Sequence, residues 1–220
     1  MKTTHKRIWL LVIVVIIYYV LTVGILFFQH FVLMEYAVAV RAVLAIVVKW
    51  LMLVLPIALM IKHREKATDI GFSREKIPMQ LLTGVYIAII MAGVLAGIPA
   101  LLGYKEILGS TVYSQPWQFV YQLIYMTLGV ALVEEIFFRG YVFKKLLDIK
   151  DSRWFAIIIS SVLFGLAHMF NNHILAVIPT AIIGVIFCLC REKIRHCTTL
   201  SLIIAHGFYN TLISLIVAFF

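Results

Sequence analysis

The sequence predicts an all-α polytopic membrane protein with about seven transmembrane helices, or eight if a re-entrant segment is also present. Of its 220 residues, 64% are hydrophobic and 13% are charged, whereas a soluble chain is about half apolar and a quarter charged. Its apolar runs reach the roughly 17–25 residues that cross the hydrocarbon of a bilayer. No soluble domain or low-complexity tract separates these runs, so residues 1–220 are expected to form a single transmembrane domain.

The apolar runs place seven spans in the chain. They cover residues 8–28, 42–61, 79–102, 117–147, 154–170, 174–190 and 200–220. The first three lie within residues 1–102, and the third is rich in Gly and Ala, which favours close helix packing. Arg41 and Lys49 lie beside or within the second span. We interpret them as snorkelling side chains, with a role in substrate docking as the alternative.

The basic residues predict the orientation of the chain. Sixteen of the nineteen Lys and Arg residues fall in segments that this threading places on one side of the membrane. The positive-inside rule assigns that side to the cytoplasm, with the amino terminus cytoplasmic and the carboxyl terminus external. Because the positive charge follows these segments, the net charge of +9 does not indicate nucleic-acid binding. Cys188, Cys190 and Cys197 lack Cys-x-x-Cys spacing and are expected to be free thiols.

Three charged residues, Glu134, Glu135 and Arg139, lie in the apolar fourth span. A charge in hydrocarbon costs roughly 3 kcal/mol on insertion scales unless it is paired or functional. Glu135 and Arg139 are four residues apart, so they can pair along one helix face. Glu134 is rotated from that face by about 100°. The pattern therefore predicts Glu135–Arg139 as structural support and Glu134 as a reactive carboxylate, with a purely structural ion cluster as the alternative.

Two later spans also contain polar residues. His168 lies in the fifth span, and His206 and Asn210 share one face of the seventh. At 1.5 Å per residue, Glu134, His168 and His206 lie roughly 15, 21 and 14 Å from the cytoplasmic flanks of their spans. We therefore expect an active site buried between helices 4, 5 and 7. The alternatives are a core histidine at position 168 and an interhelical contact made by the His206–Asn210 pair.

These residue types suit hydrolysis of an acyl group by water. A carboxylate can take a proton from water, a histidine can orient that water or protonate a leaving amine, and a second histidine with an asparagine amide can stabilise an oxyanion. This chemistry needs no covalent intermediate and no cofactor. The same Glu134, His168 and His206 could instead bind zinc, although no H-E-x-x-H motif occurs.

Taken together, the motifs E-E-x-x-x-R at 134–139, F-x-x-x-H at 164–168 and H-x-x-x-N at 206–210 resemble those of the CPBP (Abi) family. That family contains type II CAAX prenyl proteases and bacteriocin-processing or immunity proteins. The resemblance covers residues 117–217. It implies a catalytic core in which Glu134 and His168 activate water while His206 and Asn210 stabilise the oxyanion. A glutamate mechanism is preferred to a metalloprotease mechanism because Asn210 is a poor zinc ligand.

The resemblance also implies a function and a location. The chain is expected to be an intramembrane endopeptidase of a bacterial plasma membrane that cleaves a peptide bond near the cytoplasmic face. Its substrate would be a peptide or membrane protein, either prenylated or a leader peptide. The alternative is a non-enzymatic bacteriocin-immunity or scaffold protein on the same fold. A transporter is less favoured because no inverted repeat is present.

Overall fold

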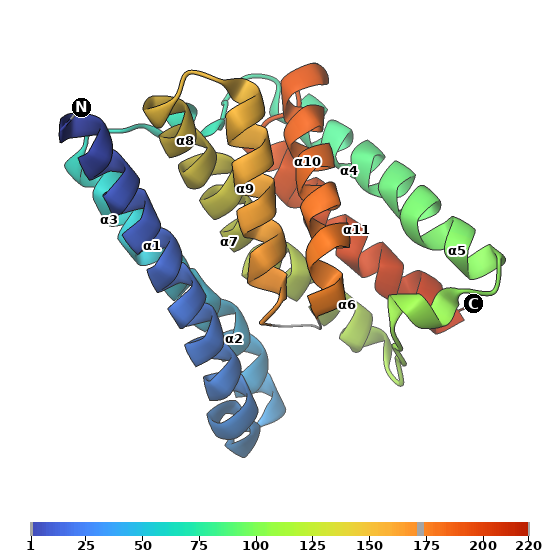
Figure 1. The fold of residues 1–220 in the computed structure, drawn as a ribbon. Helices are drawn as coiled ribbons and strands as arrows, with labels where there is room; N and C mark the ends of the chain where they lie inside the picture. The colour runs from blue at the N-terminus through green and yellow to red at the C-terminus, as the bar shows by residue number, and fades with distance from the viewer. Residues whose placement is uncertain (1, 171–173, 220) are drawn as a thin grey trace.

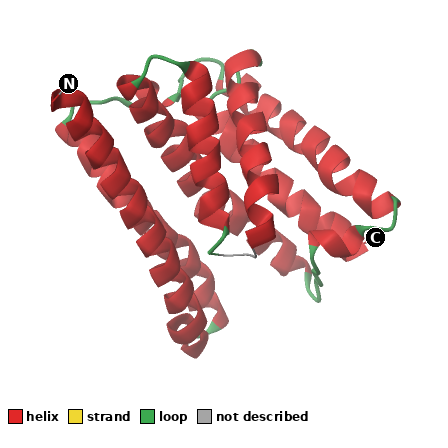
Figure 2. Cartoon of the chain, viewed as in Figure 1, coloured by secondary structure: helices red, strands yellow, loops and turns green. Residues whose placement is uncertain are grey.

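The computed structural model describes residues 2–170 and 174–219, and all regular structure in these ranges is helical (Figures 1 and 2). The α-helices are α1 (Lys2–Phe27), α2 (Val38–Trp50), α3 (Val54–Lys62), α4 (Ile77–Ala92), α5 (Ile98–Leu101), α6 (Pro116–Ile124), α7 (Leu132–Glu134), α8 (Phe143–Ile149), α9 (Arg153–His168), α10 (Val177–Lys193) and α11 (Thr199–Phe219). Four segments are π-helical: Phe28–Val32, Gly93–Gly97, Tyr125–Ala131 and Glu135–Val142. Short 3-10 turns cover Leu33–Glu35, Leu51–Leu53, Ala67–Ile70, Lys105–Leu108 and Ile174–Ala176. The all-α prediction is confirmed.

Several of these segments join into longer helices. In the described part of the chain, six are long and apolar enough to cross a membrane: Thr4–Glu35, Val38–Lys62, Ile77–Leu101, Pro116–Ile149, Ile174–Lys193 and Thr199–Phe219. The predicted fifth span corresponds to α9, a shorter apolar helix of 16 residues. Every predicted span therefore has a helix, and the chain is an integral membrane protein with a polytopic architecture.

The helices form a bundle with a hairpin along one side. Figure 1 shows α1 beside α2 and α3 at one edge, α9 and α10 in the middle, and α4 and α5 at the other edge. α11 packs along α4, and α10 packs along α9. At both interfaces a glycine permits the approach: a Cβ on Gly84 would lie 2.5 Å from the carbonyl oxygen of Ser201, and one on Gly165 would lie 2.5 Å from that of Val177. The expected close packing of the third span is confirmed.

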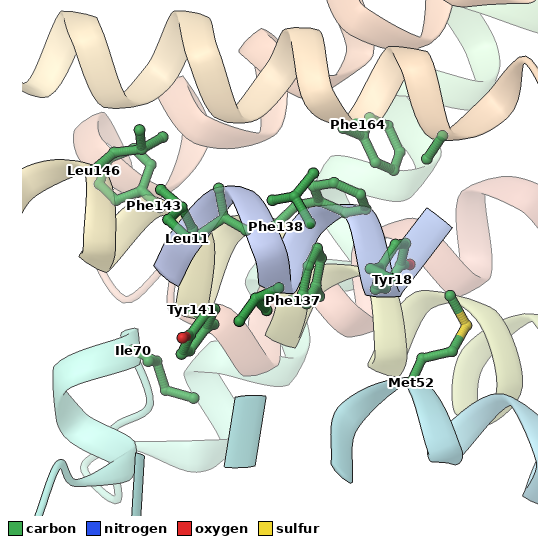
Figure 3. Packing of buried hydrophobic residues seen from close by; sticks show 14 of the residues in the cluster. Leu11, Tyr18, Met52, Ile70, Phe137, Phe138, Tyr141, Phe143, Leu146 and Phe164 are labelled. Carbon is green, nitrogen blue, oxygen red and sulfur yellow. The ribbon is translucent and has the colours of Figure 1, made fainter. Parts of the chain in front are cut away.

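Aromatic side chains join the hairpin to the rest of the bundle. Tyr18 of α1 stacks on Phe137 with 3.9 Å between ring centroids, and Phe138 contacts Phe164 of α9 edge to face at 5.4 Å. All four rings are at most 3% exposed, and Figure 3 shows them among the packed side chains of the core. Phe137 and Phe138, which follow the two glutamates in the chain, therefore place apolar rings beside them.

On the side predicted to be cytoplasmic, the loop before α4 is fixed to the start of α11. Thr199 donates from its hydroxyl to the carbonyl of Ile70 at 2.6 Å and from its backbone N–H to the carbonyl of Gly71 at 3.0 Å. Cys197 precedes this contact, and burial raises the pKa of its thiol to about 12. All three cysteines are free, as the spacing predicted.

Candidate active site

The helix that carries both glutamates departs from α-helical geometry on either side of them. The single α-helical turn α7 lies between the π-helical segments Tyr125–Ala131 and Glu135–Val142. Such segments are rare and occur most often at functional sites, because they widen the helix and change the direction of its side chains. The sequence predicted a helix over this range but gave no sign of the π-helical turns. The guanidinium of Arg191 in α10 donates to the carbonyl of Arg139 in the second segment.

Glu135 is completely buried and has partners on two helices. One of its oxygens lies 3.1 Å from Nη1 of Arg139 and 2.8 Å from Nδ1 of His206. The guanidinium carbon of Arg139 lies 3.9 Å from the centroid of the Phe164 ring, a cation–π contact. The expected Glu135–Arg139 pair is therefore present, and it connects the acidic helix to α9 and α11.

His206 lies between the two carboxylates. A carboxylate only accepts hydrogen bonds, so Nδ1 of His206 is the atom that donates to Glu135. The opposite ring nitrogen, Nε2, lies 3.8 Å from Oε2 of Glu134. His206 is only 4% exposed, and its ring also contacts the Phe187 ring at a centroid distance of 5.4 Å. Glu135 thus fixes the orientation in which His206 faces Glu134.

His168 has a backbone partner in its own helix, as in the alternative of a core histidine. Its Nδ1 lies 3.0 Å from the carbonyl oxygen of Phe164, one turn earlier in α9. Because that oxygen accepts, Nδ1 carries the proton and Nε2 of the neutral ring is left as an acceptor. Among the residues that the structure describes, no hydrogen bond joins His168 to Glu134. The structure brings His206, rather than His168, next to the proposed base.

Asn210 lies one helical turn after His206 on α11. Its amide nitrogen lies 3.9 Å from the sulfur of Met126, which is a weak acceptor. The amide therefore keeps most of its capacity to donate to a substrate. Between His206 and Asn210, a Cβ on Gly207 would lie only 2.4 Å from the hydroxyl of Thr127. Gly207 therefore lets α11 approach the π-helical segment that precedes the glutamates.

Glu134 contrasts with its neighbour because neither of its oxygens has a hydrogen-bond partner among the described residues, whereas in Glu135 only Oε2 lacks one. The residue is 8% exposed, and its Oε2 is fully buried. Glu134 lines a cavity of about 10 Å³ whose other lining residues are Tyr18, Thr22, Lys49, Met52, Gly129, Val130, Val133 and Ala167. Sequence reasoning missed Lys49 as a neighbour of the site, although a cation within an apolar run was a signal for function.

The residues of the zinc alternative do not fit a metal site as they are placed. Within residues 2–170 and 174–219, no group of three or more His, Cys, Asp and Glu side chains could hold a metal ion. Nδ1 of His206 donates to Glu135 and Nδ1 of His168 to the carbonyl of Phe164, so, within the described residues, Nε2 is the free nitrogen of each ring. As they are placed, Glu134, His168 and His206 do not form such a group.

Comparison with known proteins supports the resemblance drawn from the motifs. A family model described as type II CAAX prenyl endopeptidase Rce1-like matches residues 116–212. This range includes all three motifs and agrees with the CPBP family, so the expected resemblance is confirmed. Neither the curated proteins nor the solved structures gave a match.

Proposed function

We propose that this chain hydrolyses a peptide bond with water activated by Glu134, because residues 116–212 match the Rce1-like family model of CAAX-type proteases. The observation that carries the proposal is the difference between two adjacent carboxylates. Oε1 of Glu135 is held by Arg139 and His206, whereas neither oxygen of Glu134 has a hydrogen-bond partner among the described residues. A base needs a lone pair that is available to water, and no hydrogen bond within the described residues occupies those of Glu134.

In the proposed reaction, Glu134 takes a proton from water while the water oxygen bonds to the carbonyl carbon of the scissile peptide. The carbonyl oxygen of the resulting tetrahedral intermediate carries the negative charge. The C–N bond then breaks, and the proton held by Glu134 moves to the leaving nitrogen, so that an acid and an amine are released. Apolar walls such as Phe137 and Phe138 strengthen these charge interactions by excluding bulk water.

Donors for the oxyanion come from α11 in this proposal. The amide of Asn210 has only a weak sulfur partner, and donors of this kind are worth most where charge develops in the transition state. His206, whose ring is held by Glu135, is proposed to stabilise the oxyanion together with Asn210. His168 is proposed to act at a greater distance from Glu134, through Nε2, which accepts a hydrogen bond from the water and so orients it. No step uses a metal.

The experiment is a cleavage assay on purified protein, with an internally quenched peptide that ends in an S-farnesylated Cys-aliphatic-aliphatic-X sequence. We expect wild type to cleave it and Glu134→Gln, which keeps the shape and removes the base, to lose activity. An unmodified leader-type peptide tests the other proposed substrate class. Equal activity of Glu134→Gln and wild type would refute Glu134 as the base. Wild type that cleaves neither peptide would favour the immunity or scaffold alternative.

A separate measurement tests the metal. We expect protein treated exhaustively with a strong chelator to keep its activity and to contain no stoichiometric zinc by elemental analysis. Activity that disappears with the metal and returns with added zinc would show that Glu134, His168 and His206 come together as ligands in the working enzyme. The glutamate mechanism would then be wrong.

We also propose that the protein resides in a bacterial plasma membrane with its amino terminus in the cytoplasm and its carboxyl terminus outside. The support is the concentration of Lys and Arg in the segments on one side. Topology reporters check this orientation. A reporter after Phe220 should read as external and one in the loop between α3 and α4 as cytoplasmic, and the reverse pattern would invert the proposed site of cleavage.

A further inference from the structure

The second membrane helix carries a cation that snorkelling does not explain. Lys49 is the twelfth residue of the 25-residue helix Val38–Lys62, so it lies roughly 17 Å from one end and 20 Å from the other. A four-carbon stem is much shorter than either distance. Lys49 is half-buried and forms no hydrogen bond or ion pair within the described residues. A charge at this depth is costly and is a mark of a functional position.

Lys49 lines the same cavity as Glu134. The cavity measures about 10 Å³, close to the roughly 10–15 Å³ that one water requires. Glu134 lines this cavity, and its carboxylate makes no hydrogen bond within the described residues. An ammonium group can donate three hydrogen bonds, and a carboxylate oxygen only accepts. One water between them would accept from Lys49 and donate to Glu134, which satisfies both groups.

Trp50, the residue after Lys49, fixes the position of Lys49 along the helix that carries the two glutamates. The indole N–H of Trp50 donates to the carbonyl of Leu128 at 2.8 Å. Leu128 belongs to the π-helical segment Tyr125–Ala131, against which α2 packs. The next residue, Gly129, lines the cavity and has no side chain to fill it. The Trp50 contact therefore sets Lys49 opposite the turn that carries Glu134.

We propose that Lys49 is a further positioning residue of the active site, which holds the hydrolytic water against Glu134 from the opposite helix. This inference rests on the proposed function and extends the site beyond the 116–212 domain to the amino-terminal hairpin. Water held from two sides loses its freedom before the reaction, so the effect of Lys49 falls on the chemical step rather than on substrate binding.

The kinetic test compares wild type with Lys49→Met and Lys49→Arg on the quenched farnesylated peptide. We expect Lys49→Met, which keeps the length and removes the charge, to lower kcat by about 10- to 100-fold with KM within about threefold. Lys49→Arg should restore much of that loss because it keeps a donor. Lys62→Met, an exposed lysine at the end of the same helix, is the matched control and should retain wild-type kcat.

A second measurement needs no substrate. Thermal unfolding of Lys49→Met, Glu134→Gln and the double variant forms a cycle, and facing groups give shifts in Tm that do not add. Additive shifts would place the two charges apart and overturn the inference, as would Lys49→Met with unchanged kcat or with only a raised KM. If Glu134→Gln is inactive and Lys49→Met is not, the Lys49 role fails while the proposed function stands. Wild type inactive on both peptides would remove the function and this inference together.

Discussion

Glu134 and Glu135 are adjacent in the sequence and have opposite environments. Glu135 is 0% exposed and is held by a guanidinium from its own helix and an imidazole from α11. Glu134 is 8% exposed, makes no hydrogen bond with the described residues, and lines a cavity about the size of one water. The comparison teaches that one carboxylate builds the site while the other is left available for chemistry.

The His206 ring connects the two environments. Its Nδ1 donates to Glu135, and its Nε2 lies 3.8 Å from Glu134. Substitutions that disturb Glu135 should therefore also affect Glu134, because they change the orientation of His206. Substitutions of Glu134 should leave the contacts of Glu135 intact. This asymmetry can be measured by comparing activity with stability across a set of variants.

The largest expected effect is on catalysis at Glu134. Glu134→Gln should lower kcat by about 10²–10⁴-fold, since that is the usual contribution of a general base. Its thermal stability should stay close to that of wild type, because a neutral amide costs less in an apolar site than a carboxylate does. Peptide cleavage and thermal unfolding in detergent measure the two quantities. A large drop in Tm would show that Glu134 also supports the fold.

The next effect is on stability at the other carboxylate. Arg139→Ala should reduce the free energy of unfolding by about 3–5 kcal/mol, because it leaves Glu135 buried without its cation. Loss of the contact with the Phe164 ring adds to this cost. The variant should express poorly or unfold early on heating. Wild-type stability would mean that Glu135 is satisfied by His206 alone.

A somewhat smaller effect is expected at Asn210. Asn210→Ala should lower kcat by about 10²–10³-fold through loss of an oxyanion donor. Its folded yield should change little, because the amide has only a sulfur neighbour at 3.9 Å. Single-turnover cleavage separates this loss from slow product release. A variant whose Tm falls while its kcat stays high would identify Asn210 as an interhelical contact instead.

The smallest effect belongs to a second i,i+4 ion pair on the same long helix. Lys144 and Asp148 have the same spacing as the Glu135–Arg139 pair, but their side chains are 28% and 32% exposed. Exposed pairs of this kind contribute about 0.3–0.5 kcal/mol, so Asp148→Asn should change stability by no more than that. Chemical or thermal denaturation of Asp148→Asn and Arg139→Ala compares two ion pairs with the same spacing that differ mainly in burial. A large loss would mean that the pair is buried in the native membrane.

Most of the fold could be predicted because lipid allows few alternatives. Helices satisfy their own backbone hydrogen bonds in hydrocarbon, so apolar length alone located every span, and α9 proved shorter than the run around it. The Glu135–Arg139 pair could be predicted because both residues lie on one helix, where spacing determines distance.

Contacts between helices could not be predicted in this way. The rotation of α11 that directs His206 to Glu135 depends on the close approach permitted at Gly207 and on the π-helical turns beside the glutamates. The periodicity of hydrophobic residues in the sequence indicates neither of these features. Lys49 was interpreted by its charge alone because its distance from the helix ends was not weighed against the length of its side chain. His168 was grouped with Glu134 by depth, but depth does not give direction.

The short helix α9 has a consequence for the lipid around the protein. Its 16 residues give a length of about 24 Å, while the hydrocarbon of a typical bilayer is about 30 Å thick. Such a mismatch is relieved by thinning of the adjacent leaflets. Where α9 faces lipid, we expect the bilayer to be thinned, which would shorten the path by which water and a polar peptide enter from the aqueous phase.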